Sequence, residues 1–549
     1  MSDRKFVLGV DFGTESGRAV LVEVETGEEV GTEVYPYADG VIDHTLNGQE
    51  LPPDWALQNP EDYLRTLNRT VPAVLASSGV TAEQVVGIGI DFTSCTMLPT
   101  DAAGAPLCTK PEWKDAPHAW VKLWKHHAAQ PEADKINQLA QARGEAWLQR
   151  YGGKYSSEWF FSKVWQILDE APEVYYAADR LLEGADWAVW QMTGRETRNL
   201  CTAGYKAIYD KRTGFVSNEF LRVLDPALEH VIDQKMMRTV SPLGECAGGL
   251  SREMAALTWL RPGTPVAIAN VDAHVSVPAA GIAEPGKLLM IMGTSICHMV
   301  LGTTSQPVPG MCGVVEDGIL PGFFGYEAGQ SGAGDILAWL VRTFYPEAGA
   351  AVHQDLEAQA AALKPGECGL LALDWWNGNR SVLVDTHLSG LLVGATLDTT
   401  PVEIYRALIE SIAFGTRAII ENFEQYGLAV NELYACGGMA EKNTLLMQIF
   451  SDVTGRPIKL ARSSQASALG AAMFGAVAAG SGGGGYDTIY DAIPRMGGAR
   501  EQVYTPHEAN HRTYTALFQE YVALHDHFGR GSNDVMKRLR AIKAEQRAG

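Results

Sequence analysis

The sequence of 549 residues has little cysteine and no Cys-x-x-Cys pair. Eight scattered cysteines in so long a chain do not suggest a disulfide scaffold, and the missing pairs argue against a structural zinc site. The longest uncharged stretch, Ser463 to Tyr486, is rich in Ala and Gly and too weakly apolar to predict a membrane span. The N-terminal residues lack the apolar region and cleavage site of a signal peptide. We therefore expect a cytoplasmic protein with no membrane partner.

The sequence also lacks runs of basic residues. It contains 65 acidic and 44 basic side chains, for a net charge of −21, which disfavours binding to nucleic acid. The chain is long enough for more than one domain, and its 46% apolar residues suit a globular protein rather than a disordered one.

Two common phosphate-binding motifs are absent. No G-x-x-x-x-G-K-[ST] sequence occurs, and the motifs of protein kinases are missing as well. Any nucleotide chemistry must therefore use another fold.

One candidate site is the turn that follows an apolar strand, Phe6 to Val10. Gly13 lets the backbone turn sharply and present N–H groups to an anion, while Thr14 adds a hydroxyl and Arg18 a positive charge. Asp11, at the carboxyl end of the strand, is placed to hold a hydrated Mg²⁺, which favours oxygen ligands. The alternative interpretation is a tight hairpin with a capping aspartate.

The pattern of strand, Phe12-Gly13-Thr14 and strand recurs later as strand, Met292-Gly293-Thr294 and strand. Two such turns indicate two domains of related topology, with Gly293 and Thr294 as a second phosphate clamp, although Gly-Thr turns also recur by chance. Strands and helices alternate in the second half of the chain, which predicts an α/β fold. The glycines from 482 to 485 predict a flexible joint.

Further candidates lie at the ends of other predicted strands. Asp272 follows a strand and could accept the proton of an attacking hydroxyl, with His274 as the rival base and a helix cap as the structural alternative. Gly437 and Gly438 open a helix and leave room for an adenine ring against the backbone, and Gly334 is a weaker candidate of the same kind.

In this order and spacing, the motifs resemble the FGGY family of carbohydrate kinases, over residues 5 to about 480. The resemblance is carried by Asp11 to Thr14, by Asn270 to His274, by Met292 to Ser295, and by Gly437 and Gly438 with Lys442 and Asn443. A looser match runs from Gly378-Asn379-Arg380-Ser381 to Gly394, where Asn379 replaces the usual acidic residue. The resemblance implies two actin-like (ribonuclease H-like) α/β domains flanking a catalytic cleft, with ATP and Mg²⁺ as cofactors.

Within the family, the likeness is to members that phosphorylate the ketopentose L-ribulose. It is carried by Gly89 to Thr96, which includes Thr93 and Ser94, by Ser156 to Lys163, and by Tyr326 to Ser331. Glycerol kinases have an Arg-Glu pair after the strand that here ends at Asp91, and its absence argues against glycerol. The resemblance places Lys206 and Glu327 in the sugar pocket with Thr93, Ser94 and Asp272, and it places Asp11 and Asp272 near the metal. Without the family, Lys206 and Glu327 would be taken for surface ion pairs.

We therefore predict a sugar-binding domain over residues 1–284, a nucleotide-binding domain over 285–485 and a helical extension over 486–549. The expected reaction transfers the γ-phosphoryl group of ATP to the terminal hydroxyl of L-ribulose in arabinose catabolism, with Asp272 as the base. The alternatives are a kinase for another pentulose or pentitol, and a non-metabolic actin-like ATPase. A sugar-sensing regulator would normally carry a basic helix-turn-helix, which neither end offers. A homodimer is one option for the assembly.

Overall fold

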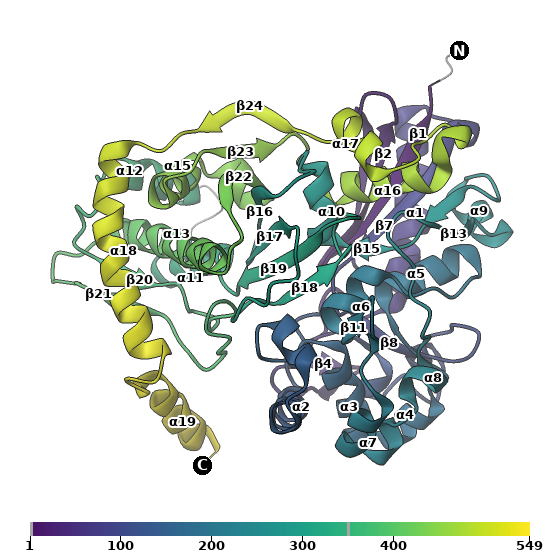
Figure 1. Cartoon of the computed structure of the whole chain (residues 1–549), viewed down its shortest axis with the longest axis horizontal. Helices are drawn as coiled ribbons and strands as arrows, with labels where there is room; N and C mark the ends of the chain where they lie inside the picture. Colours follow the sequence, from purple (N-terminus) through teal and green to yellow (C-terminus); the bar gives the residue numbers. More distant parts are fainter. Residues whose placement is uncertain (1–3, 348–351, 549) are drawn as a thin grey trace.

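The computed structural model describes residues 4–347 and 352–548, so residues 1–3, 348–351 and 549 of the expected domains lie outside the described part. Within the described residues, two seven-stranded sheets occupy separate halves of the molecule (Figure 1). A smaller four-stranded sheet and several helices extend the first half.

The first large sheet is built around β1, the apolar run that the sequence predicts as a strand. β1 pairs antiparallel with β2 and parallel with β7, and β2 pairs antiparallel with β3. On the other side of β7 lie β14, which pairs with β13, and the short β15. The bounds of these strands are β1 Phe6–Phe12, β2 Ser16–Glu23, β3 Glu29–Pro36, β7 Val85–Phe92, β13 Cys246–Gly249, β14 Pro265–Ala267 and β15 Asn270–Val271.

The second large sheet repeats this arrangement. β16 pairs antiparallel with β17 and parallel with β22, β17 pairs antiparallel with β19, and β22 pairs parallel with β23. The two Gly-Thr turns therefore occupy equivalent hairpins, and the predicted pair of related domains is confirmed. The bounds are β16 Gly286–Met292, β17 Ile296–Gly302, β18 Gly313–Glu316, β19 Phe324–Gln330, β22 Val430–Cys436, β23 Ile458–Ala461 and β24 Ala499–Tyr504.

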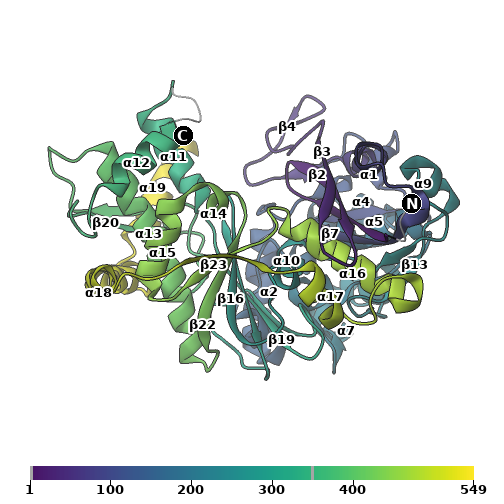
Figure 2. The same ribbon diagram turned by 90° about the horizontal axis from the view of Figure 1, so that it is seen from above.

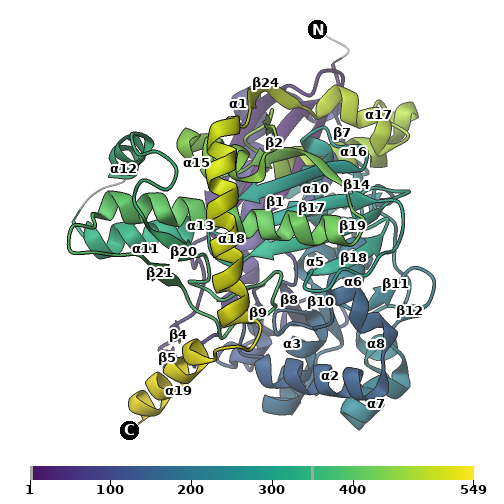
Figure 3. The ribbon, with the colours of Figure 1, turned by 60° about the vertical axis from the view of Figure 1, so that its left-hand side comes forward.

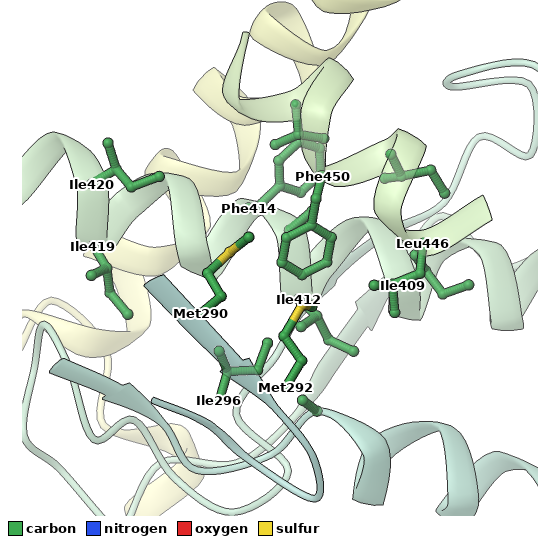
Figure 4. Close-up of a cluster of buried hydrophobic side chains, with 14 of the residues drawn as sticks. Met290, Met292, Ile296, Ile409, Ile412, Phe414, Ile419, Ile420, Leu446 and Phe450 are labelled. Atoms are coloured by element: carbon green, nitrogen blue, oxygen red, sulfur yellow. The ribbon is translucent and has the colours of Figure 1, made fainter. Parts of the chain in front are cut away.

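The core of the second half forms where this sheet meets α13 (Pro401–Gln425) and α15 (Thr444–Thr454). Figure 4 shows Met290 and Met292 of β16 among Ile412, Phe414 and Phe450. These side chains are fully shielded from solvent, and each contributes about 1.5–3 kcal/mol when buried. The packing holds the strand that leads into the second Gly-Thr turn.

The region from 110 to 260 is mostly helical, as its composition suggests. Its small sheet comprises β10 (Arg180–Glu183), β8 (Met97–Thr100), β9 (Val121–Lys122) and β6 (Leu57–Gln58). Other helices of the molecule are α1 Pro60–Ser78, α2 Gln130–Arg143, α3 Phe160–Glu170, α6 Leu200–Lys206, α10 Asp272–Ala279, α11 Gly334–Phe344, α14 Gly438–Lys442 and α16 Ala466–Gly483.

Helices α10 and α16 pack against each other where the two halves meet (Figure 2). α16 follows β23 of the second sheet in the chain but lies on β7 and β1 of the first sheet. By its place in the chain α16 falls in the expected domain 285–485, whereas it packs against the sheet of the other half. Among the described residues, α16 alone has the length and composition to cross a membrane, yet 56% of it is buried in the protein.

Glycines on β1 and β7 let α16 approach the sheet closely. A methyl group on Gly9 would lie 1.8 Å from the carbonyl oxygen of Ala468, and one on Gly89 would lie 1.7 Å from that of Ala471. Neither distance can be accommodated without moving the helix. These glycines therefore fix the helix on which the candidate site rests.

We expect Gly89→Ala to lower the free energy of unfolding by about 2–3 kcal/mol, because the added methyl group overpacks this contact. Gly482→Ala is the matched control within α16, because a methyl group there meets no atom within 4 Å. The control should be neutral or stabilising by about 0.5–1 kcal/mol, since alanine favours helix more than glycine does. Urea denaturation of both variants measures the difference, and equal stabilities would contradict the packing argument.

The C-terminal segment differs from the expected helical extension over 486–549. β24 pairs antiparallel with β23, so this segment completes the second sheet. α18 (Glu508–Gly529) buries Tyr514, Phe518 and Tyr521 in the core of the second half, and α19 (Val535–Ala548) extends beyond it (Figure 3). The predicted flexible joint is wrong, because α16 continues to Gly483 with a kink at Gly480. The domain limits themselves stay a prediction.

Candidate active site

The first Gly-Thr turn is a tight hairpin held in place from several sides. The backbone N–H of Gly13 donates to the carbonyl of Ser16 at 3.0 Å. The hydroxyl of Thr14 accepts a hydrogen bond from Trp124 Nε1 at 3.0 Å, and its carbonyl accepts one from Gln58 Nε2 at 2.7 Å. The turn therefore has a fixed shape, which hydrogen bonds from residues distant in the chain help to maintain.

Arg18 lies opposite Asp11 in the β1–β2 pair. Its Nε is 3.0 Å from Asp11 Oδ2, and its Nη1 donates to Gln465 Oε1 at 2.9 Å, just before α16 begins. In this structure, Arg18 thus serves first to neutralise Asp11 and to join the turn to α16.

Three aspartates gather at the carboxyl ends of β1, β7 and β15. Asp11 and Asp91 are partners in the parallel β1–β7 pair, and Asp91 pairs with Asn270, two residues before Asp272. Both oxygens of Asp91 are buried without a hydrogen-bond partner among the described residues. Burial and the neighbouring charges of Asp11 and Asp272 raise the pKa of Asp91 well above its ordinary value. This edge of the sheet therefore gathers three carboxyl groups, and the raised pKa of Asp91 favours its neutral form.

Asp272 begins α10 and is only partly exposed. Its Oδ1 accepts a hydrogen bond from the N–H of Ala273 at 2.7 Å. Burial, then the charge of Asp11, raises its pKa to about 7, with Glu327 adding to the effect and Lys206 opposing it. Because Asp11 belongs to the first half and Glu327 to the second, Asp272 lies where the two halves meet. A carboxylate that titrates near neutrality suits a general base.

Lys206 and Glu327 form a buried ion pair between the two halves. Lys206 Nζ is 2.9 Å from both carboxylate oxygens of Glu327, with the side chains 5% and 8% exposed. Burial acts to lower the pKa of Lys206, but the charge of Glu327 raises it above its ordinary value. Burial likewise opposes ionisation of Glu327, yet Lys206 holds its pKa well below the usual range. The pair is therefore charged and is not the surface salt bridge of the alternative interpretation.

His274, the rival base, lies behind this pair. Its Nε2 is 3.4 Å from Glu327 Oε2, and its ring packs against Tyr205 with the ring centres 4.4 Å apart and the planes tilted by 50°. Burial lowers its pKa. The residue is only 1% exposed, so its ring faces the protein interior rather than a bound sugar hydroxyl.

Thr93 and Ser94 follow β7 next to Asp91. The Thr93 hydroxyl shares a hydrogen bond of 2.7 Å with that of Thr96, and the Ser94 hydroxyl is buried without a partner among the described residues. Ser94 thus retains an unused donor close to the aspartates.

The second Gly-Thr turn meets two other glycine segments. The carbonyl of Thr294 accepts from the N–H of Ala333 at 2.9 Å, and that of Gly293 accepts from Gly334 at 3.2 Å, at the start of α11. A methyl group on Gly437 would lie 2.5 Å from the carbonyl of Met292. The structure therefore brings residues 292–294, 333–334 and 437–438 together, as a nucleotide site requires.

The adenine-side candidates are arranged less uniformly. Gly438 begins α14, and a methyl group on it would meet no atom within 4 Å, so the backbone there is open. Lys442 ends the same helix. The side-chain oxygen of Asn443 caps α15 by accepting from the N–H of Leu446 at 2.8 Å. Asn443 therefore has a structural function already.

Sequence reasoning missed Asp91 and Arg380 as site residues. A signal for the first was present, because Gly9-Val10-Asp11-Phe12 and Gly89-Ile90-Asp91-Phe92 share one pattern and lie in register, with stacked Phe12 and Phe92 rings. Arg380 stands in the loosely matching signature, and no local pattern reveals that it reaches across to the first half.

Two Gly-Thr turns, an aspartate with a raised pKa and a buried ion pair lie where the two α/β halves meet, and this arrangement suits a carbohydrate kinase. Residues 6–277 match the model of the N-terminal domain of the FGGY family of carbohydrate kinases, and residues 288–479 match that of its C-terminal domain. The chain belongs to this family.

More specific similarity extends along the whole chain. It is 59% identical over 555 residues to a ribulokinase of Geobacillus thermodenitrificans, covering 99% of this chain and 98% of the relative. It is 51% identical over 552 residues to a ribulokinase of Mycolicibacterium smegmatis, covering 98% and 97%. Among solved structures, the xylulose kinase of Rhodospirillum rubrum aligns with a TM-score of 0.77 at 25% identity, over 95% of this chain and 98% of that one.

Proposed function

We propose that this kinase phosphorylates L-ribulose to L-ribulose 5-phosphate in the cytoplasm, as a step of L-arabinose catabolism. The carrying observation is the position of Asp272, between the Asp11 turn and the Lys206–Glu327 pair, with its pKa raised to about 7. Ribulokinases at 51–59% identity over nearly the whole chain support the choice of sugar.

Asp272 acts as the base, taking the proton of the 5-hydroxyl as that oxygen attacks the γ-phosphorus of ATP. The bond between that phosphorus and the β,γ-bridging oxygen breaks, and ADP leaves. The turns at Gly13 and Thr14 and at Gly293 and Thr294 orient the phosphates through backbone N–H groups and hydroxyls. Gly334, Gly437 and Gly438 line the nucleoside side with Lys442 and Asn443. Closure of the two domains on the sugar excludes water and limits wasteful hydrolysis of ATP.

The acidic edge fits a hydrated Mg²⁺ rather than a fully caged ion. Among residues 4–347 and 352–548, no three His, Cys, Asp or Glu side chains converge closely enough to hold a metal. Mg²⁺ commonly keeps several waters and binds through one or two carboxylates together with substrate phosphates, so Asp11 and Asp272 would suffice. When bound, the ion offsets the negative charge that develops on the transferred group.

The sugar is held by directed hydrogen bonds. Lys206 donates to the ketone or a hydroxyl, Glu327 accepts from a hydroxyl, and Thr93 and Ser94 complete the pocket. A neighbouring pentulose or pentitol is the second candidate, because small changes in the placement of these groups decide the stereochemistry.

Coupled detection of ADP release tests the proposal directly. With the four 2-ketopentoses, the pentitols and glycerol as acceptors, we expect the highest kcat/KM for L-ribulose and almost no turnover with glycerol. A higher kcat/KM for another pentulose or a pentitol would refute the assigned sugar. ADP release that does not depend on any added acceptor would instead indicate a non-metabolic ATPase.

A further inference from the structure

An ion pair joins the two halves of the molecule beside the sugar-binding pair, and the proposed roles above leave it unused. Arg380 follows β20 (Leu371–Leu373) in the second half, and its guanidinium binds the carboxylate of Glu158 in the first half. The other oxygen of Glu158 is 2.9 Å from His127 Nε2. The side chains of Arg380 and Glu158 are only 20% and 16% exposed, so the pair is shielded from solvent.

The stem of Arg380 is fixed next to Glu327. Its Cδ passes so close to Gly329 that a methyl group there would approach it to 2.8 Å, and Gly329 donates its N–H to the hydroxyl of Ser381 at 3.2 Å. Gly329 lies two residues beyond Glu327 on β19. The stem of Arg380 therefore passes over the part of β19 that carries the Glu327 carboxylate, and the guanidinium lies beyond it.

The guanidinium of Arg380 is connected to the first Gly-Thr turn through Trp124. Its central carbon lies 5.7 Å from the centre of the Trp124 ring, and Trp124 donates its indole N–H to the hydroxyl of Thr14. A continuous series of contacts thus runs from β19 through Arg380 and Trp124 to Thr14. Arginine suits this position because its planar group can bind a carboxylate and lie against an aromatic ring at once.

We propose that Arg380, held by Glu158, is a positioning residue for phosphoryl transfer, which fixes Trp124 and through it Thr14 of the first phosphate turn. The inference rests on the proposed kinase function but not on which sugar is the acceptor. The second half thereby sets the geometry of a phosphate clamp that belongs to the first half. Misplacing a reacting group by about 1 Å costs on the order of 100-fold in rate.

Three variants separate this role from simple bridging of the domains. Arg380→Met removes both contacts, Arg380→Lys retains a charge for Glu158 but not the planar group on Trp124, and Trp124→Phe removes the donor to Thr14. Each should lower kcat about 10- to 100-fold, while the Kd of the sugar, measured by calorimetry without ATP, changes less than threefold. Because all three act on Thr14, the double variant Arg380→Met with Trp124→Phe should lose no more than the worse single variant.

The matched control is Arg212→Met. Arg212 pairs with Glu316 at 3.1 Å between the same halves, but its side chain is 70% exposed. Its kcat should equal that of the native protein. If Arg380→Met unfolds, Arg380→Met with Glu158→Gln leaves no unpaired charge and provides a folded variant, which should retain the loss of kcat.

The assays use whichever acceptor gives the native protein its highest turnover, so an error in the assigned sugar leaves the test intact. A kcat for Arg380→Lys and Arg380→Met within threefold of the native value would overturn the proposal. So would multiplicative losses in the double variant, because independent effects would show that Arg380 does not act through Trp124.

Discussion

Asp272→Asn should fold, bind the sugar and lose about three decades or more of turnover. The amide keeps the shape of the carboxylate and can still contact a hydroxyl, but it cannot take up the proton of the attacking group. Calorimetric titration of the sugar and coupled ADP detection measure the two properties separately. Turnover within tenfold of the native value would remove Asp272 from the role of base.

The pH dependence of the native enzyme gives a second measure of the same assignment. The pKa of Asp272 is raised to about 7, chiefly by burial and by Asp11. The active form is the deprotonated one, so kcat/KM should rise with pH through this range and level off above it. The residual activity of Asp272→Asn should lack that rise.

The variant His274→Gln tests whether His274 is the base instead. If the three-decade loss and the missing step follow His274 instead, the assignment is wrong.

Lys206→Met should both destabilise the protein and abolish measurable sugar binding. Lys206 and Glu327 are almost completely buried, and removing the ammonium group leaves the Glu327 carboxylate without its charged partner. Breaking a buried pair from one side costs about 3–5 kcal/mol. Urea denaturation should show this loss, and calorimetry should detect no binding of the acceptor that the native protein prefers.

A neutral pair separates the two effects. Lys206→Met with Glu327→Gln removes both charges, so most of the stability should return while sugar binding stays lost, because the ammonium donor is gone and a neutral amide is a weaker acceptor than the carboxylate. Arg143→Met, which breaks exposed pairs with Glu145 at 3.0 Å and Glu219 at 3.2 Å, is the control and should leave the free energy of unfolding nearly unchanged. If Lys206→Met is as stable as that control, the pair does not hold the two halves together.

Much of the fold follows from local patterns. Apolar spacing in the sequence predicts a helix over 60–77, a strand over 85–90 and a helix over 401–426, and the structure has these as α1, β7 and α13, each within two residues at its ends. Such elements are determined by apolar spacing and by caps such as the Thr400–Glu403 box, which act over a few residues. Chain order, by contrast, does not reveal that α16 packs on the first sheet or that β24 joins the second, because packing on a distant sheet leaves no local signal.

The candidate site likewise contains residues that the sequence marks and residues whose role only the tertiary structure reveals. Asp11, the two Gly-Thr turns and Asp272 stand at strand ends that the sequence marks, so their residue types and order are sufficient to suggest a phosphate site. Asp91 and Arg380 acquire their importance from neighbours that are distant in the chain. Asp91 could have been found from the shared Gly-x-Asp-Phe pattern, but its burial and unpaired oxygens could not.

The sequence by itself determined the two-domain actin-like class and the residues proposed to bind phosphate, because turns, glycines and strand-end carboxylates are local features. Only the tertiary structure decided that Lys206 and Glu327 form a buried pair, that Asp272 lies between them and Asp11, and that Arg380 reaches Glu158. Those relations depend on how two sheets meet, and burial, charge coupling and pKa values arise only from that meeting.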